Sequence, residues 1–155
     1  MLSTVISLVP FARDEPFKIV GIGAGDSVVS AALHDTFPGA TLVTVDGAES
    51  KLATLDWWDV MFGADVVLAW RCLYRLNDAK KQYLYKAIAD RLSSRGLFLI
   101  ADRLAPQQLL HHLIWLKHAG FPVVDCFWLR DRHAVFGGLK QAAASTPPLR
   151  AGSSA

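Results

Sequence analysis

The sequence predicts an α/β fold of three layers, in which helices cover both faces of a mostly parallel central sheet that ends in an antiparallel hairpin. Apolar runs of strand length alternate with runs of helical periodicity. Glycines follow the first apolar run directly, and an acidic residue follows the second. Hydrophobic residues make up 52% of the 155 residues and charged residues 19%, which is typical of strands buried on both faces.

The first half of the chain is expected to alternate between helices and strands. Its opening run, MLSTVISLVPFA, is interpreted as a short packing helix; a cleaved signal peptide is the alternative for such an apolar start. Pro38 and Gly39 end the next helix before the second strand begins. The expected elements are a strand at 17–22, a helix at 27–36, a strand at 41–45, a short helix at 48–55 and a strand at 65–70.

The second half is expected to hold two longer helices and the hairpin. Asn77 is a favourable N-cap, and Gly96 is expected to end the helix that follows in a left-handed cap. The expected elements are helices at 78–92 and 106–119, a strand at 97–101, and hairpin strands at 121–129 and 133–137. Residues 1–140 are then a single domain, while 141–155 are small, polar and proline-containing, which predicts a disordered tail.

Composition and charge argue against several classes of protein. The net charge is +2 without any run of Lys and Arg, so nucleic acid is not an expected partner. No apolar run is long enough to cross a membrane. Cys72 and Cys126 lie far apart and outside any metal-binding spacing, which argues against a disulfide framework or a zinc site and favours the cytoplasm. His111 and His112 are adjacent and point in different directions, so we interpret both as structural.

The glycines between the first strand and its helix predict a site for a cofactor that contains a nucleoside. Gly21, Gly23 and Gly25 let backbone N–H groups approach a ligand, and the following helix N-terminus favours anionic groups. Asp46 ends the next strand, where an acid can accept hydrogen bonds from ribose hydroxyls. The pattern is typical of a Rossmann-like fold. A tight turn with a solvated or helix-capping Asp46 is the alternative.

Trp70 is a further candidate for the site, because it ends a central strand at the carboxyl side, where open α/β sheets bind ligands. Arg71 and Tyr74 follow it and are candidates for contact with a substrate. Large aromatic residues are equally common in cores, so a packing role for Trp70 stays open.

The order of these elements and three segments resemble the class I S-adenosylmethionine-dependent methyltransferases, in particular small bacterial proteins with a methyltransferase domain. The resemblance covers about residues 8–140. Its segments are KIVGIGAGDSVVSAALHDTFPGATLVTVDGAES, DWWDVMFGADVVLAWRCLYRLNDAKKQYLYKAIADRLSSRGLFLIADRLAP and WLKHAGFPVVDCFWLRDRHAVFGGLK.

The resemblance implies S-adenosylmethionine as cofactor and methyl transfer to a small-molecule acceptor. In that family the glycine loop wraps the methionine part of the cofactor, and the acid after the second strand holds the ribose. The implied cofactor-binding residues here are Gly21, Gly23, Gly25, Asp46, Gly47 and Trp70. No catalytic residue is implied, because a methyl displacement can proceed once donor and acceptor are held in line.

The sequence also departs from the family pattern. Gly21 stands where the family loop has an acid, and Ser27 stands where it has the last glycine. The segment between Lys51 and Trp57 is too short for the family's third strand, which forms a sheet edge, and the insertion that commonly closes over substrate is absent. The expected strand order is therefore second, first, third, fourth, sixth, fifth. An exposed second strand could be covered by Trp57 and Trp58 or pair with a second copy in a homodimer.

Two other functions stay open at this stage. A non-catalytic module with the methyltransferase fold and weak or no cofactor binding is consistent with the altered glycine loop and the missing family strand. A nicotinamide-binding Rossmann domain is consistent with an acid after the second strand, although the terminal hairpin favours the methyltransferase pattern. No nucleophile elbow or phosphate-binding lysine loop is present, which argues against a hydrolase or a nucleoside triphosphatase.

Overall fold

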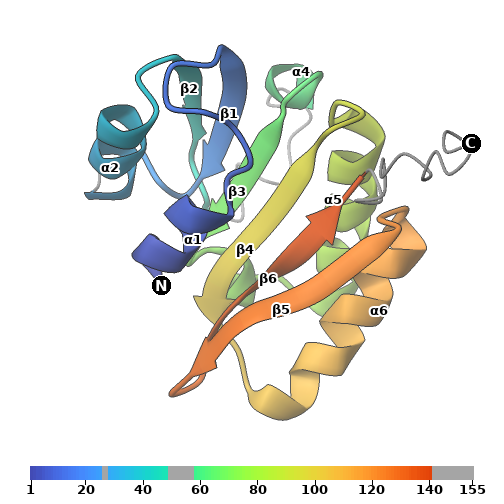
Figure 1. Ribbon diagram of the computed structural model, residues 1–155. Helices are drawn as coiled ribbons and strands as arrows, with labels where there is room; N and C mark the ends of the chain where they lie inside the picture. The colour runs from blue at the N-terminus through green and yellow to red at the C-terminus, as the bar shows by residue number, and fades with distance from the viewer. Residues whose placement is uncertain (26–27, 49–57, 141–155) are drawn as a thin grey trace, which may run out of the picture.

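The computed structural model describes residues 1–25, 28–48 and 58–140, which form a six-stranded sheet with helices on both faces (Figure 1). The order across the sheet is β2-β1-β3-β4-β6-β5, which confirms the expected order and the terminal hairpin. The strands are β1 (Phe17–Ile22), β2 (Ala40–Val45), β3 (Val66–Trp70), β4 (Leu97–Arg103), β5 (Val123–Arg130) and β6 (His133–Leu139).

The helices form two layers, one on each face of the sheet (Figure 1). Alternate residues of each strand point to opposite layers: in β3, Val66 and Leu68 belong to one core and Val67 and Ala69 to the other. The first layer is α1 (Leu2–Leu8) and α2 (Val28–Thr36), and the second is α4 (Trp58–Met61), α5 (Asp78–Arg91) and α6 (Leu109–Ala119); two short 3₁₀ helices are η1 (Leu73–Arg75) and η2 (Pro106–Gln108). The three layers and the packing helix at the start are confirmed.

The parallel strands all end at one side of the sheet, which we call the carboxyl edge. β1 pairs in parallel with β2 and β3, and β3 pairs in parallel with β4. β6 runs antiparallel to β4, so it begins where β4 ends, with His133 opposite Arg103. The carboxyl edge therefore consists of the loops that follow β1 to β4 together with the β5–β6 turn at 131–132.

β2 is an outer strand, as the missing family strand predicts. Within the described residues no strand lies beyond it. The expected helix at 48–55 and Trp57 fall on residues 49–57, outside the described part. Trp58 is buried under the guanidinium of Arg91, which lies 4.4 Å from a ring centroid, and its ring makes an edge contact with Tyr83. Trp58 therefore attaches α4 to α5.

The expected left-handed cap at Gly96 is wrong. α5 ends at Arg91, and Leu92 after it is already extended, with φ −62° and ψ 151°. A Cβ at Gly96 would lie 2.6 Å from that of Leu92, so glycine is needed there for close packing of the turn. Gly120 instead forms such a left-handed cap, at the end of α6: its φ is 119°, and its N–H donates to the carbonyl groups of Leu116 and Lys117.

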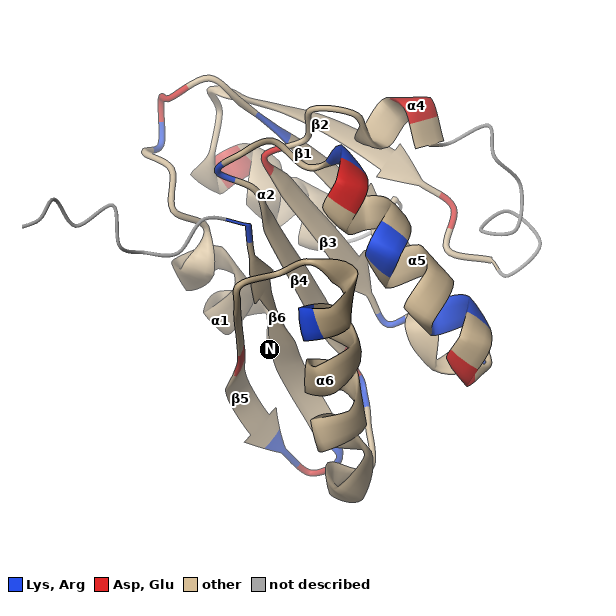
Figure 2. Cartoon of the chain, turned by 90° about the vertical axis from the view of Figure 1, so that its right-hand side faces the viewer, with Lys and Arg blue, Asp and Glu red and all other residues tan. Residues whose placement is uncertain are grey.

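A buried polar pair joins the two long helices. The Tyr85 hydroxyl of α5 lies 2.8 Å from Nδ1 of His112 in α6, and both side chains are buried. Burial lowers the pKa of His112 from its ordinary 6.5 to about 4, so the ring is neutral at neutral pH. This confirms a structural role for His112. Figure 2 shows that α6 carries few charged residues, whereas α5 presents several of both signs to solvent.

Candidate functional site

Three loops of the carboxyl edge meet at two glycines and a cysteine. Gly23, after β1, has φ +77°, and a Cβ on it would lie 2.7 Å from the carbonyl oxygen of Trp70. Gly47, after β2, has no room either, because a Cβ there would lie 2.7 Å from that of Cys72. The N–H of Gly23 donates to the carbonyl of Val45 at 2.9 Å, which joins the first two loops. The approach of these backbones requires glycine at both positions.

A cavity of about 370 Å³ opens beside this junction, and we call it the glycine cavity. Asp46 projects there as an exposed side chain. Its Oδ1 accepts the N–H of Ala48 at 2.9 Å, which fixes the carboxylate, while Oδ2 has no hydrogen-bond partner in the described residues. The lining residues are Gly23, Gly25, Thr44, Val45, Asp46 and Gly47. The structure therefore brings together four of the six residues expected to bind the cofactor.

Gly25 differs from Gly23 because nothing in the fold requires a glycine there. A Cβ on Gly25 would lie 3.6 Å from Oγ1 of Thr44, which is ordinary contact. Gly25 is also exposed. The absence of a side chain at this position leaves the cavity open, which suits a ligand that needs close access to the backbone.

Gly21 does not belong to the loop. It lies inside β1, where it is buried and pairs with Thr44 of β2 and Leu68 of β3. A Cβ at Gly21 would lie 3.2 Å from that of Ala24, which is tight. Gly21, which replaces the family acid, therefore lies in β1 between β2 and β3, and it does not line the glycine cavity.

Trp70 is placed by strand alternation on the face covered by α1 and α2, where its half-buried side chain packs against the core. The glycine cavity is not lined by this ring. Its backbone carbonyl, in contrast, faces Gly23 at the loop junction. Any contribution of Trp70 to the site through its ring stays a prediction.

Cys72 supports the junction as a neutral thiol. The side chain is buried, and its Sγ donates to the carbonyl of Ile22 at 3.7 Å. Burial raises the pKa of this thiol to about 12, so a reactive thiolate does not form near neutral pH. Cys72 therefore packs the loops and is not a nucleophile.

Asp102 is a buried carboxylate that the sequence analysis missed. Its Oδ2 accepts the N–H groups of Leu73 and Tyr74 at 2.8 and 3.2 Å, and its Oδ1 accepts that of Arg103 at 2.8 Å. Burial raises its pKa, and these three hydrogen bonds oppose that rise. Asp102 thereby holds η1 against the end of β4. An acid directly after the apolar run LFLIA was the signal, the same signal that pointed to Asp46.

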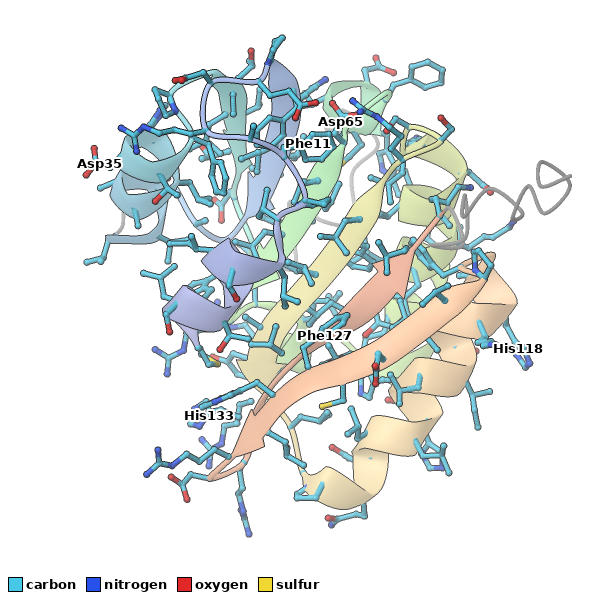
Figure 3. The ribbon with its side chains drawn as sticks, viewed as in Figure 1. Phe11, Asp35, Asp65, His118, Phe127 and His133 are labelled. Atoms are coloured by element: carbon cyan, nitrogen blue, oxygen red, sulfur yellow. The ribbon has the colours of Figure 1, made fainter. Side chains whose placement is uncertain are left out.

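A second cavity, of about 470 Å³, lies at the same edge where β3 and β4 end and β6 begins, and we call it the arginine cavity. Arg71 and Tyr74, the expected candidates for substrate contact, both line it. His133, which is labelled in Figure 3 beside the β5–β6 turn, also lines the arginine cavity. The other lining residues are Asp102, Arg103, Asp131 and Arg132.

The described part of the chain has neither a metal cluster nor a membrane-spanning helix. There, no group of three or more His, Cys, Asp or Glu side chains is arranged to hold a metal ion. None of the helices described combines the length and the apolar character needed to cross a membrane.

This chain resembles known proteins in structure, but its sequence matches none of the families or curated proteins compared. No family model matches the sequence, and no curated protein matches it. Solved structures match over most of this chain. An O-methyltransferase family protein from Burkholderia thailandensis aligns with a TM-score of 0.71 at 15% identity over 92% of this chain, and human N-acetylserotonin methyltransferase in complex with S-adenosylmethionine aligns with 0.70 at 15% over 91%. The chain has a methyltransferase fold.

The same fold recurs in a shorter protein. The precorrin-6y C5,15-methyltransferase from Geobacter metallireducens aligns with a TM-score of 0.65 at 13% identity, over 91% of this chain and 87% of its own. The chain spans only about half of the first two proteins, 56% and 52% respectively. At these identities the likeness establishes the methyltransferase fold alone.

The two loop glycines give different expectations for stability. Gly23→Ala is expected to lower the free energy of unfolding by about 1 to 3 kcal/mol, because alanine would be strained at a positive φ and would crowd the Trp70 carbonyl. Gly25→Ala is the control and should change it by less than about 0.5 kcal/mol. Urea unfolding followed by tryptophan fluorescence measures both. Equal losses for the two variants would contradict the loop geometry.

Proposed function

We propose that this chain binds S-adenosylmethionine in the glycine cavity and methylates a small-molecule acceptor at the carboxyl edge. The observation that carries the proposal is the cavity itself, in which an open glycine backbone from the loop after β1 lies beside an exposed, oriented carboxylate from the loop after β2. The methyltransferase fold supports the same position. Human N-acetylserotonin methyltransferase was solved with S-adenosylmethionine and PigF with its demethylated product.

The residues of the glycine cavity fit this cofactor in chemistry and in space. The free Oδ2 of Asp46 can accept a hydrogen bond from a ribose hydroxyl, while Oδ1 stays tied to Ala48. Gly25 leaves room that a side chain would fill. Gly23 and Gly47 allow the loops after β1 and β2 to pack closely enough to form one wall of the glycine cavity. Asp46 and the two glycines of the first loop are thus the proposed binding residues.

The proposed chemistry places few demands on the protein's side chains. When bound, S-adenosylmethionine would supply a sulfonium methyl group for direct displacement by an acceptor atom and would leave as the neutral thioether. The protein's contribution is to hold both molecules in line and to exclude competing contacts. The neutral Cys72 thiol and the fully hydrogen-bonded Asp102 are consistent with structural rather than chemical roles.

A non-catalytic module is the second candidate, favoured by a specific observation. β2 is an outer strand in the described sheet, and Gly21 occupies the strand position at which the family has an acid. Weak or absent binding of the cofactor, together with no methyl transfer to any acceptor, would support this candidate.

The assembly and location of the protein are further parts of the proposal. We infer a homodimer formed by the outer edge of β2, because this edge has no partner strand in the described residues. Sedimentation across a range of concentrations should show a dimer, and a constant monomer mass would contradict it.

The free cysteines Cys72 and Cys126 favour the cytoplasm. Residues 1–140 are proposed as one domain, and the tail expected at 141–155 lies outside the described residues.

Calorimetric titration with S-adenosylmethionine and its demethylated product tests the proposed site. Gly25→Leu is expected to weaken binding at least about tenfold by filling the cavity, and Asp46→Asn by a similar factor through loss of a charged acceptor. The matched controls are Ala31→Leu and Asp35→Asn, both at exposed positions of α2, and they should leave affinity unchanged.

Two outcomes would reject the proposed function. The first is the absence of heat with either ligand at millimolar concentration. The second is equal weakening by the site variants and their controls. A parallel titration with NADH tests the alternative of a nicotinamide-binding domain. The proposed function predicts that NADH does not bind.

A further inference from the structure

The arginine cavity collects cationic side chains that have no partners. Arg71, Arg103 and Arg132 all line it, from the ends of β3 and β4 and from the β5–β6 turn. All three are exposed, and within the described residues none of their guanidinium groups has an ion pair or hydrogen bond. Figure 2 shows basic and acidic residues side by side at the β5–β6 turn.

The acidic groups of the cavity are already engaged. The carboxylate of Asp102 accepts three backbone N–H groups, so it is directed into the protein. The carboxylate of Asp131 lies 3.4 Å from Nε of Arg130, a residue outside the cavity lining, in a pair that is exposed on both sides. The lining therefore holds three guanidinium groups against two carboxylates, of which only that of Asp131 is exposed.

The backbone takes a positive φ at three residues around the cavity. Arg71, Asp131 and Arg132 have φ values of 52°, 50° and 65°, and these are the non-glycine residues with positive φ in the described chain. All of them line the arginine cavity. At 131–132 a positive φ at both residues is the ordinary geometry of a two-residue β-hairpin turn, whereas Arg71 lies outside such a turn and its conformation costs of the order of 1 kcal/mol or more. Glycine or asparagine would be less strained at Arg71 and Arg132.

His133 adds a further polar group to the same wall. Its Nδ1 lies 3.0 Å from the carbonyl oxygen of Asp131, so Nδ1 carries the proton and donates to that carbonyl. Nε2 is then the ring nitrogen left for a ligand. Asp131 and His133 thus brace the turn that presents Arg132.

The arginine cavity is adjacent in the chain to the proposed cofactor site. A Cβ on Gly23 of the glycine cavity would lie 2.7 Å from the carbonyl oxygen of Trp70, and the next residue, Arg71, lines the arginine cavity. The N–H of Arg71 donates to the carbonyl of Ala101 at 2.8 Å, which fixes it at the end of β3. A molecule bound in the arginine cavity is therefore held at the same carboxyl edge as the cofactor.

We propose that the arginine cavity binds the methyl acceptor and selects molecules that carry a carboxylate or phosphate group. The acceptor role rests on the proposed function. Guanidinium groups hold both anions through paired N–H donors, and an unpaired cluster of them disfavours neutral or cationic molecules. Arg103 lies opposite His133 in the β4–β6 pairing, and the N–H of Leu104 donates to the carbonyl of Arg132 at 2.8 Å, so the two arginines are held on neighbouring parts of the lining and are the proposed anion-binding residues.

Titration with inorganic phosphate and with benzoate tests the cavity and separates the two sources of the anion. The full chain is followed by NMR at constant ionic strength. The double variant Arg103→Gln/Arg132→Gln should bind at least tenfold more weakly whichever of the two anions the wild-type chain binds more tightly. The control is Arg13→Gln with Lys117→Gln, which removes the same charge from exposed positions outside the cavity and should change affinity less than twofold. The probe that binds more tightly identifies the anion class.

A second variant keeps the test independent of folding. Arg132→Asn replaces the arginine by a neutral residue that tolerates positive φ, so the turn should keep its shape while binding weakens severalfold. Three results would overturn the inference: no binding of either probe by the wild-type chain at millimolar concentration, equal weakening by the control pair, or unchanged binding by Arg132→Asn.

The same samples distinguish failure of this inference from failure of the proposed function. Loss of anion binding in the double variant, with S-adenosylmethionine binding retained, supports a separate acceptor cavity. Binding of S-adenosylmethionine without any anion binding overturns only the inference. Specific anion binding without S-adenosylmethionine binding overturns the acceptor role together with the proposed function, and leaves the anion site.

Discussion

The close packing of Gly23 and Gly47 against the Trp70 carbonyl and the Cys72 side chain determines the arrangement of the carboxyl edge. Neither glycine could carry a Cβ without meeting Trp70 or Cys72 at 2.7 Å. Because these loops touch, the open space is displaced to one side, where the exposed Gly25 and Asp46 line a cavity. The burial of Cys72, which keeps its thiol neutral, belongs to the same packing. The position of the candidate cofactor site is thus a consequence of steric exclusion at its neighbours.

Asp102 plays the corresponding role on the other side of the edge. A buried carboxylate is stabilised only when its oxygens are hydrogen-bonded, and here three backbone N–H groups satisfy it. These bonds fix the turn after β3, and with it Tyr74 at the arginine cavity. Two cavities therefore share one edge, each formed by an interaction in which backbone geometry, rather than side-chain flexibility, decides where the functional groups lie.

The sequence predicted the layers and the strand order well, because alternation and periodicity record burial directly, as the runs at 17–22 and 97–101 illustrate. It identified Gly23, Gly25, Asp46 and Gly47 through their places after strands. It could not place the ring of Trp70, which depends on the strand register, and it counted Gly21 as a loop residue although β1 extends through it. Gly96 was misjudged, because the same glycine serves a helix cap or a close contact with Leu92. The positive φ of Arg132 follows from the tight turn of the expected hairpin, whereas that of Arg71 has no signal in the local sequence.

Hydrogen–deuterium exchange with and without S-adenosylhomocysteine, the demethylated product, tests the central claim that the glycine cavity is the cofactor site. We expect slower exchange of the backbone amides at 21–25 and 44–48 when the ligand is bound, with no change in α6, which lies away from the cavity (Figure 1). Protection confined to other parts of the chain, or no protection at saturating ligand, would contradict the claim.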